Sequence, residues 1–312
     1  MPFSSSIEGS FGYGRSQIIQ SIPVGNLPTY YTSSSGFIMN QPGYTAITLQ
    51  LKTLANISSA TVIRTYSSLN AAWTTIHDKD LDSNVWYNMP EGSRILYKYT
   101  LAKGGTSITT TNLGTYTGAS TSVLGACYAP AIMWGNTTSY GAFIIGGFSQ
   151  AVLHVLEFNS TKSGWSNTYT VSYPATQIYG TEIIPKAASG FTQDFGVAYS
   201  RTPKTMASWT VNMATRSWTN LKDNTYTAGI NGPSNGCGMI YYPIGKPIFT
   251  NDPDTSTNRL AMNDTSSSSL YVWTVTQSGN DLVWTYLKTV NIGLGNAYYP
   301  YNMSQNTYDS IA

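Results

Sequence analysis

Apolar and polar residues alternate in short runs along most of the chain, and turn-forming residues separate the runs. Residues 141–168 show the pattern best. An apolar run ends at the doublet Gly146-Gly147, and an alternating run then continues to Phe158. A polar turn leads on to Trp165. Alternation with a period of two residues is typical of β-strands, so the segment predicts consecutive antiparallel strands; no long stretch carries a clear helical period.

A hairpin that ends on a Trp or Thr recurs along the chain. The run that begins at Trp209 returns at Trp218, and the run that begins at Trp273 returns at Trp284. Alignment on this feature gives five returning positions: Trp73, Thr110, Trp165, Trp218 and Trp284. These positions are 37, 55, 53 and 66 residues apart, which suits a repeated four-stranded sheet with loops of variable length. We expect the repeated tryptophans to pack between neighbouring units.

Three further strand pairs are expected ahead of the hairpins, and they bring each unit to four strands. They are residues 131–134 with 143–147, 182–184 with 195–199, and 239–242 with 248–249. Residues 27–52 predict two more strands around a turn at 40–43. A ring of sheets is usually closed by pairing an N-terminal strand with the last sheet. We therefore expect residues near 30–40 to pair with residues near 290–303.

The doublet Gly146-Gly147 after an aliphatic strand, followed by Phe158 and Trp165, resembles a blade of a kelch-type β-propeller. The resemblance covers about residues 50–290 and implies an all-β propeller of five or six four-stranded blades, closed by the chain ends. Later units carry Ala198-Tyr199 and Thr250-Asn251 in place of the doublet, so the resemblance concerns architecture. A β-sandwich array or a β-solenoid is the alternative, and each unit is long for one solenoid coil.

The propeller interpretation divides the chain into three parts. Residues 1–26 form an N-terminal arm, residues 27–303 the propeller, and residues 304–312 a C-terminal tail. The arm contains Phe11, Tyr13 and Arg15 among glycines. We interpret these three residues as an interaction arm that docks on a neighbouring subunit, and an ordinary glycine-rich turn is the alternative.

Charge and hydropathy argue against a nucleic-acid partner and against a membrane span. Only 10% of the residues are charged, and the formal net charge is +2. The 16 Lys and Arg are scattered singly, without the basic run that would neutralise a row of phosphates, so we expect no nucleic-acid partner. No apolar run approaches the length of a membrane span, and the N-terminus lacks the pattern of a Sec signal peptide. The sequence predicts a soluble protein.

Asp78, Asp80 and Asp82 are the strongest candidates for metal binding. Carboxylates at alternate positions of a loop can converge on Ca²⁺, which takes about six to eight oxygen ligands. However, Ser83 stands where an EF-hand has Gly, and Met89 stands where it has Glu. A charged turn between blades is therefore the other interpretation, and no cofactor apart from calcium is expected.

Catalytic signals are scarce. His77 and His154 are the only histidines, and Cys127 and Cys237 form either a disulfide or two buried thiols. No unit repeats an acidic residue that could pair across a sugar. We expect no catalytic residues and no enzyme activity, with a glycoside hydrolase as the residual possibility.

Two classes of function remain. In the first, the protein is a structural or attachment component of a virus-like particle or surface assembly, located in a virion or another extracellular assembly, and its partners are other protein subunits. Its composition, low in charge and rich in Tyr, Asn, Thr and Gly, is similar to that of many virion proteins. In the second, it is a lectin-like propeller that binds a cell-surface glycan. We expect the first.

Overall fold

The computed structural model describes the part of the chain that carries the β-structure. The described residues are 36–40, 47–51, 61–66, 76–78, 80, 85–90, 92–101, 108–135, 139–201, 204–225, 236–244, 256–264, 269–291 and 302–306. Within these ranges no helix is long and apolar enough to cross a membrane.

Within the described ranges, the strands form five antiparallel four-stranded sheets. In the order in which the strands lie in each sheet, innermost first, they are β20 (Asn302–Asn306), β1 (Gly36–Asn40), β2 (Ile47–Leu51) and β3 (Thr61–Tyr66); β4 (Ile76–His77), β5 (Val85–Asn88), β6 (Ile95–Leu101) and β7 (Ile108–Thr115); β8 (Val123–Ala129), β9 (Ala142–Gly147), β10 (Val152–Phe158) and β11 (Trp165–Ser172); β12 (Ile178–Ile184), β13 (Asp194–Arg201), β14 (Lys204–Asn212) and β15 (Ser217–Thr225); and β16 (Gly236–Tyr242), β17 (Asn258–Asp264), β18 (Ser269–Ser278) and β19 (Asp281–Asn291).

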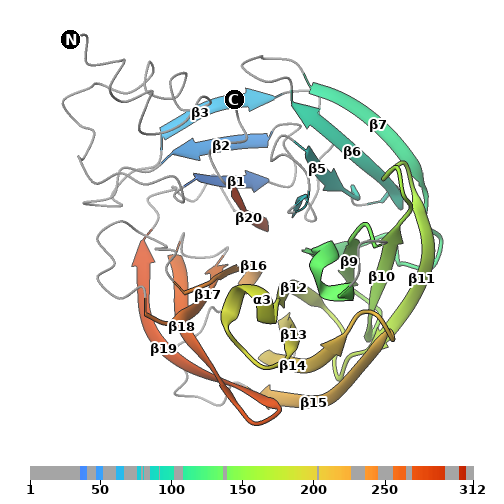
Figure 1. Cartoon of the computed structure of the whole chain (residues 1–312). Helices are drawn as coiled ribbons and strands as arrows, with labels where there is room; N and C mark the ends of the chain where they lie inside the picture. Colours follow the sequence, from blue (N-terminus) through green and yellow to red (C-terminus); the bar gives the residue numbers. More distant parts are fainter. Residues whose placement is uncertain are drawn as a thin grey trace, which may run out of the picture.

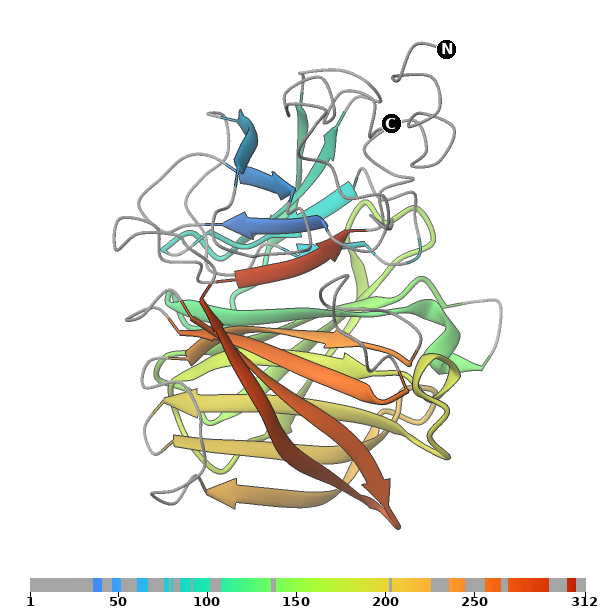
Figure 2. The same ribbon diagram turned by 90° about the vertical axis from the view of Figure 1, so that its left-hand side faces the viewer.

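The sheets stand around a common centre, as Figure 1 shows from one end and Figure 2 from the side. Their innermost strands are neighbours: β4 lies beside β8, β8 beside β12, β12 beside β16, β16 beside β20, and β20 beside β4. Each sheet then extends outward through three more strands. This is the architecture of a β-propeller, and it confirms the all-β propeller expected from the sequence.

The hydrophobic core lies between adjacent sheets. Along β9, Phe143 and Ile145 pack toward the sheet β4–β7, whereas Ala142 and Ile144 pack toward the sheet β12–β15. Both faces of the strand are therefore buried, which explains why its sequence is a continuous apolar run and does not alternate with polar residues. A third cluster fills the space between β12–β15 and β16–β19.

The innermost strands β8, β12 and β16 share a Gly-x-x-x-x-Pro pattern that the sequence analysis did not single out. Each contains a β-bulge at its glycine or directly before it, where the register with the neighbouring strand shifts. The three pairs are Gly125 with Pro130, Gly180 with Pro185, and Gly238 with Pro243. A Cβ atom on Gly125 would lie 2.9 Å from the backbone nitrogen of Gly180. The absence of a side chain thus permits the backbones of β8 and β12 to approach closely.

The proline of each pattern follows the end of an innermost strand. After Pro130 the chain forms a 3₁₀ helix, η2 (Ala131–Trp134), and after Pro185 it forms a one-turn helix, α3 (Lys186–Ser189). Each helix ends at a glycine in the left-handed region, Gly135 with φ 67° and Gly190 with φ 73°, a conformation that favours glycine. Both helices lie on the face of the propeller turned to the viewer in Figure 1.

Four of the five expected hairpins are confirmed: β6 with β7, β10 with β11, β14 with β15, and β18 with β19. The fifth is wrong, because Arg64 lies in β3, whereas Ile76, at the end of the expected returning run 73–76, begins β4 of another sheet. Trp73 lies outside the described residues. The strands expected around the turn at 40–43 are confirmed as β1 and β2.

Two of the expected strand pairs need correction. Residues 131–134 form η2, and the strand that pairs with β9 is β8. Pro130 and the left-handed Gly135 bracket this apolar stretch and favour one helical turn over an extended strand. The partner of β16 is β17, not residues 248–249, so β17 and not Thr250-Asn251 occupies the second position of that unit. The pairing of residues 182–184 with 195–199 is confirmed.

We predict that Gly125→Ala destabilises the fold by about 1–3 kcal/mol, because the new methyl group meets backbone atoms of the next sheet that cannot move independently. Urea unfolding at equilibrium measures the change. Gly164→Ala is the matched control, since its Cβ would meet its nearest atom, the carbonyl oxygen of Leu113, at 3.4 Å. Equal stability of the two variants would contradict the close approach of β8 and β12.

Candidate functional site

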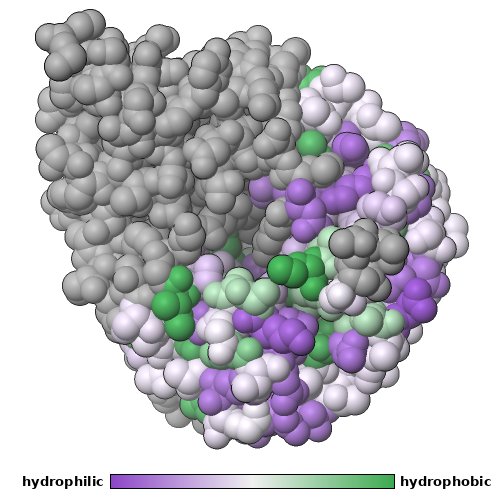
Figure 3. Space-filling model, in the orientation of Figure 1, coloured by the Kyte–Doolittle hydropathy of each residue, from purple (hydrophilic) through white to green (hydrophobic). Residues whose placement is uncertain are grey.

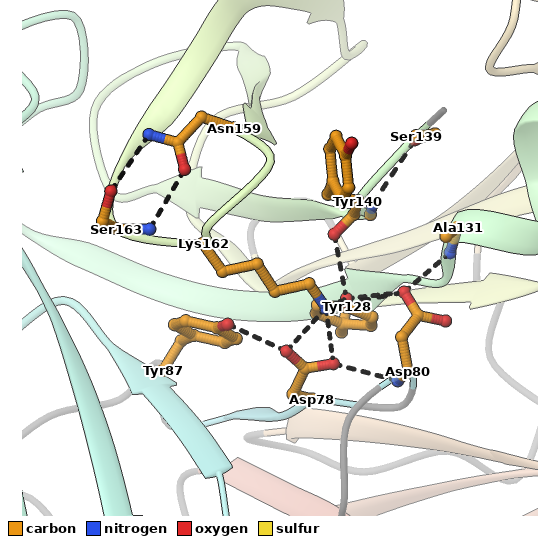
Figure 4. Close-up of polar contacts among 11 residues, drawn as sticks. Asp78, Asp80, Tyr87, Tyr128, Ala131, Ser139, Tyr140, Asn159, Lys162 and Ser163 are labelled. Atoms are coloured by element: carbon orange, nitrogen blue, oxygen red, sulfur yellow. Dashed lines mark hydrogen bonds and ion pairs between the residues drawn. The ribbon is translucent and has the colours of Figure 1, made fainter. Parts of the chain in front are cut away.

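The acidic turn that follows β4 faces a lysine from the next sheet. Lys162 lies in the turn between β10 and β11, and its side chain is only 7% exposed. Its Nζ lies 3.0 and 2.8 Å from the two carboxylate oxygens of Asp78 (Figure 4). The same atom lies 3.8 Å from Oδ2 of Asp80. The two carboxylates thus share one buried positive charge.

Two tyrosines complete this group of polar side chains. The hydroxyl of Tyr87 donates to Oδ2 of Asp78 at 2.8 Å. The hydroxyl of Tyr128 donates to Oδ2 of Asp80 at 2.7 Å and accepts a hydrogen bond from Lys162 at 2.6 Å. Both tyrosine side chains are drawn beside the lysine in Figure 4. Every polar atom of this group that is named here has a partner, as burial requires.

Burial and the charge of Lys162 shift the pKa of Asp78 in opposite directions. Burial by itself raises the pKa of Asp78, but the charge of Lys162 and the hydrogen bonds to the carboxylate outweigh it and hold that pKa below its usual value. Burial, with the nearby carboxylates, raises the pKa of Tyr87 and Tyr128 far above the usual value. At neutral pH the acid is ionised and both phenols are protonated, so the phenols serve as hydrogen-bond donors.

The structure brings together two of the three carboxylates proposed for calcium. Asp78 and Asp80 contact the same ammonium group, and Asp82 lies outside the described residues. In the described part of the chain, no group of three or more His, Cys, Asp or Glu side chains is arranged to hold a metal ion. Calcium binding therefore stays a prediction. The sequence analysis missed Lys162, whose partner lies far away along the chain.

A second charged contact joins the next two sheets in the same way. Arg216, in the turn between β14 and β15, donates to both carboxylate oxygens of Glu157 on β10, at 2.8 to 3.2 Å. Lys162 and Arg216 occupy matching places in a Thr-basic-Ser sequence, and both have a left-handed backbone, with φ 49° and 56°. A non-glycine residue in this region is uncommon. In both turns, the basic side chain binds an acid of the preceding sheet.

The outer end of the β18–β19 hairpin also binds the preceding sheet, through neutral groups. Gln277 accepts a hydrogen bond from the backbone nitrogen of Thr192 at 2.8 Å and donates to its hydroxyl at 2.7 Å. Lys222 on β15 pairs with Asp281 at 2.7 Å on the surface. The three described outer turns thus each contact the sheet before their own.

His154 is buried in β10. Its Nδ1 lies 3.1 Å from the hydroxyl of Tyr116, and its Nε2 lies 2.9 Å from Oε1 of Gln150. Burial lowers the pKa of the imidazole. The same Gln150 oxygen accepts from the backbone nitrogen of Ser120, so these side chains hold the connection between β7 and β8.

The tryptophans of the recurring hairpins pack between sheets, as expected. Trp165 contacts Tyr116 edge to face, with a centroid distance of 6.0 Å, and lies against Gly114 of the preceding sheet. Trp218 packs on Trp209 and donates to the hydroxyl of Tyr169 at 3.4 Å. Their contacts stabilise the sheet interfaces.

The remaining candidates are only partly described. Phe11, Tyr13 and Arg15 of the proposed arm lie outside the described residues, so the arm stays a prediction. Cys127 is buried in β8, and the side chain of Cys237 on β16 is not among those described. A disulfide between Cys127 and Cys237 therefore stays a prediction.

Comparison with known proteins concerns the fold. No protein-family model matches the sequence, and no curated protein is detectably similar to it. A solved structure of a protein from Lactobacillus plantarum is 11% identical, with a TM-score of 0.48 over 85% of this chain and 69% of that one. The Dos1 propeller is 10% identical, with a TM-score of 0.42 over 79% and 53%. Hsv2 of Kluyveromyces lactis is 9% identical, with a TM-score of 0.39 over 84% and 88%.

We predict that Lys162→Met destabilises the fold by about 3–5 kcal/mol, because it leaves Asp78 buried without its positive partner. Equilibrium urea unfolding of the two proteins measures the difference.

Lys222→Met is the matched control for this prediction. Its ion pair with Asp281 is 40% and 41% exposed, and such surface pairs contribute about 1 kcal/mol or less. The double variant Lys162→Met with Asp78→Asn should recover part of the loss. A Lys162→Met protein as stable as the Lys222→Met protein would refute the buried ion pair.

We also predict that His154 makes stability depend on pH in the weakly acid range. Because its pKa is lower in the folded state than the unfolded value of about 6.5, the unfolded chain takes up the proton more readily. The contribution of neutral His154 to the free energy of unfolding is present above about pH 6.5 and is lost as the pH falls below that value. Urea midpoints at about pH 7.5 and about pH 5.5 should therefore differ more for the native protein than for His154→Gln. If the urea midpoint changes equally with pH in both proteins, His154 does not cause the pH dependence.

Proposed function

We propose that this chain is a non-enzymatic structural or attachment protein of a virus-like particle or surface assembly, and that it acts through protein–protein contacts. The propeller serves as a rigid body in this proposal, and one of its faces carries the contact. The location we propose is a virion or another extracellular assembly.

We further propose that the propeller is a closed ring of five blades, joined by the two ends of the chain. Pairing of β20 with β1 supports this, with Gly36 opposite Asn306 and Asn40 opposite Asn302. The first sheet then takes its innermost strand from the C-terminus, and that strand extends past residue 303, the expected end of the propeller. We also propose a relation to kelch-type blades. Gly146 of the glycine doublet supports it, because Gly146 packs against the side chain of Ile178 in the next sheet.

The ion pairs between adjacent sheets support a scaffold. Lys162 with Asp78, and Arg216 with Glu157, hold adjacent sheets together. An ion pair of this kind favours one relative placement of its two elements over others, since a shifted arrangement leaves a charge buried without a partner. The ring that results is suited to presenting loops in fixed positions.

Loops on one end of the propeller form hydrogen bonds to polar side chains of neighbouring segments. The backbone nitrogen of Ala131, the first residue of η2, donates to Asp80 at 2.8 Å. Asn258, only 3% exposed, donates to the carbonyl oxygen of Ser189 in α3 at 2.9 Å and accepts from the backbone nitrogen of Ile244 at 3.3 Å. We call Ala131–Trp134, Lys186–Ser189 and Pro243–Ile244 together the loop face.

The observation that carries the proposal is that this loop face exposes apolar side chains from a fixed backbone. Ile132 is 61% exposed and Ile244 is 50% exposed. Figure 3 shows hydrophobic residues over η2 and close to α3, on the face turned to the viewer. Exposed apolar groups on a preorganised backbone favour association, because little conformational entropy is lost on binding.

The native mass of the protein tests this function. We expect the chain to be recovered from its source in a large complex, and we expect light scattering of the purified chain to give a mass well above the monomer mass of 33.9 kDa. A chain that is monomeric in both preparations would overturn the proposal. Glycan-array and glycosidase screens would then test the lectin and hydrolase alternatives.

A further inference from the structure

We propose that the loop face binds the N-terminal arm, residues 1–26, of a second copy of this chain. The inference rests on the proposed function and names both surfaces of one contact in the assembly. It depends on where the chain enters the propeller, on the chemistry of the two surfaces and on the length of the segment.

The N-terminal segment joins the propeller at the end that carries the loop face. η2 and α3 follow the C-terminal ends of the innermost strands β8 and β12. β20 is also an innermost strand, and its arrowhead in Figure 2 points toward the side where these two helices lie. β1 runs antiparallel to β20, and Gly36 pairs with Asn306 at that same end. Residues 1–35 therefore precede a strand that starts on the loop-face side.

The arm and the loop face match in chemistry. Glu8 and Arg15 are the charged residues among residues 1–35, which also contain Phe11 and Tyr13. An aromatic segment of low charge can cover exposed aliphatic side chains with little cost in desolvating ions. The loop face offers such side chains in Ile132 and Ile244.

The charge that the loop face exposes is positive. Lys186 is the first residue of α3, and its side chain is exposed, as are the neighbouring alanines. Glu8 in the arm can supply the complementary negative charge close in sequence to the aromatic pair. Opposite charges at the edge of an apolar contact fix orientation more than they add affinity.

The arm is long enough to reach another copy. A chain spans at most about 3.3–3.6 Å per residue, so residues 1–35 can extend over about 120 Å, more than the diameter of a domain of this size. An arm of one copy on the loop face of the next is a head-to-tail contact, which builds rings or extended arrays. Such growth fits a component of a particle or a surface layer.

Photo-crosslinking between two isotopic forms of the full chain tests the inference. Phe11 is replaced by p-benzoylphenylalanine in unlabelled protein, which is mixed with ¹⁵N-labelled protein, illuminated and analysed by mass spectrometry. We expect crosslinks from the unlabelled arm to labelled peptides that contain Ala131–Trp134, Lys186–Ser189 or Pro243–Ile244. The isotope pattern separates crosslinks between copies from crosslinks within one chain.

Two matched variants serve as controls. Ile132→Ser with Ile244→Ser in the labelled protein should reduce these crosslinks at least tenfold. Phe148→Ser should leave them unchanged, because Phe148 is 43% exposed in the loop between β9 and β10, at the opposite end of the sheet. Both proteins should keep the unfolding midpoint of the native chain, which shows that a lost crosslink reflects a lost contact.

The outcomes separate this inference from the function on which it rests. Crosslinks within one chain, crosslinks to other surfaces, or no crosslinks would each overturn the inference. If the double isoleucine variant still assembles with the native mass, the inference is wrong and the structural role stands. If the native chain forms no assembly at all, the proposed function fails as well.

Discussion

A sheet with two apolar faces must be covered on both, and this constraint governs the architecture of the chain. Phe143 and Ile145 of β9 require one neighbouring sheet, and Ala142 and Ile144 require another. Sheets that each need two neighbours are satisfied when they stand around a common centre. The glycines of the innermost strands make this possible, because the strands are closest together there and side chains would keep Gly125 away from Gly180.

Hydrophobic contacts alone would let neighbouring sheets slide, and the polar contacts between sheets oppose this. Lys162 and Arg216 come from equivalent turns and bind acids of the preceding sheet, while Gln277 makes the corresponding contact through neutral groups. Each basic residue adopts an uncommon left-handed backbone to do so. The side chains that looked most like candidates for chemistry, Asp78 and Asp80, belong to this system of contacts.

Polar contacts also hold the backbone of the loop face at the surface of the propeller. Asp80 and the buried Asn258 form hydrogen bonds with backbone groups of η2, α3 and Ile244. A surface loop that only connects two strands does not need such support. These hydrogen bonds lie beside exposed isoleucines, which is why we propose an interaction at this end of the propeller.

The sequence by itself determined the strand content, four of the five hairpins and the position of the tryptophans between sheets, because these follow from alternation and from short-range turns. The sequence also contains the repeated Gly-x-x-x-x-Pro pattern and the two Thr-basic-Ser turns. The first pattern becomes recognisable once Gly125, Gly180 and Gly238 are known to lie in equivalent strands. Only the tertiary structure showed that β17 is the partner of β16 and that Lys162 meets Asp78. These features depend on contacts between residues far apart in the chain, and local pattern does not specify which distant side chain fills a buried position.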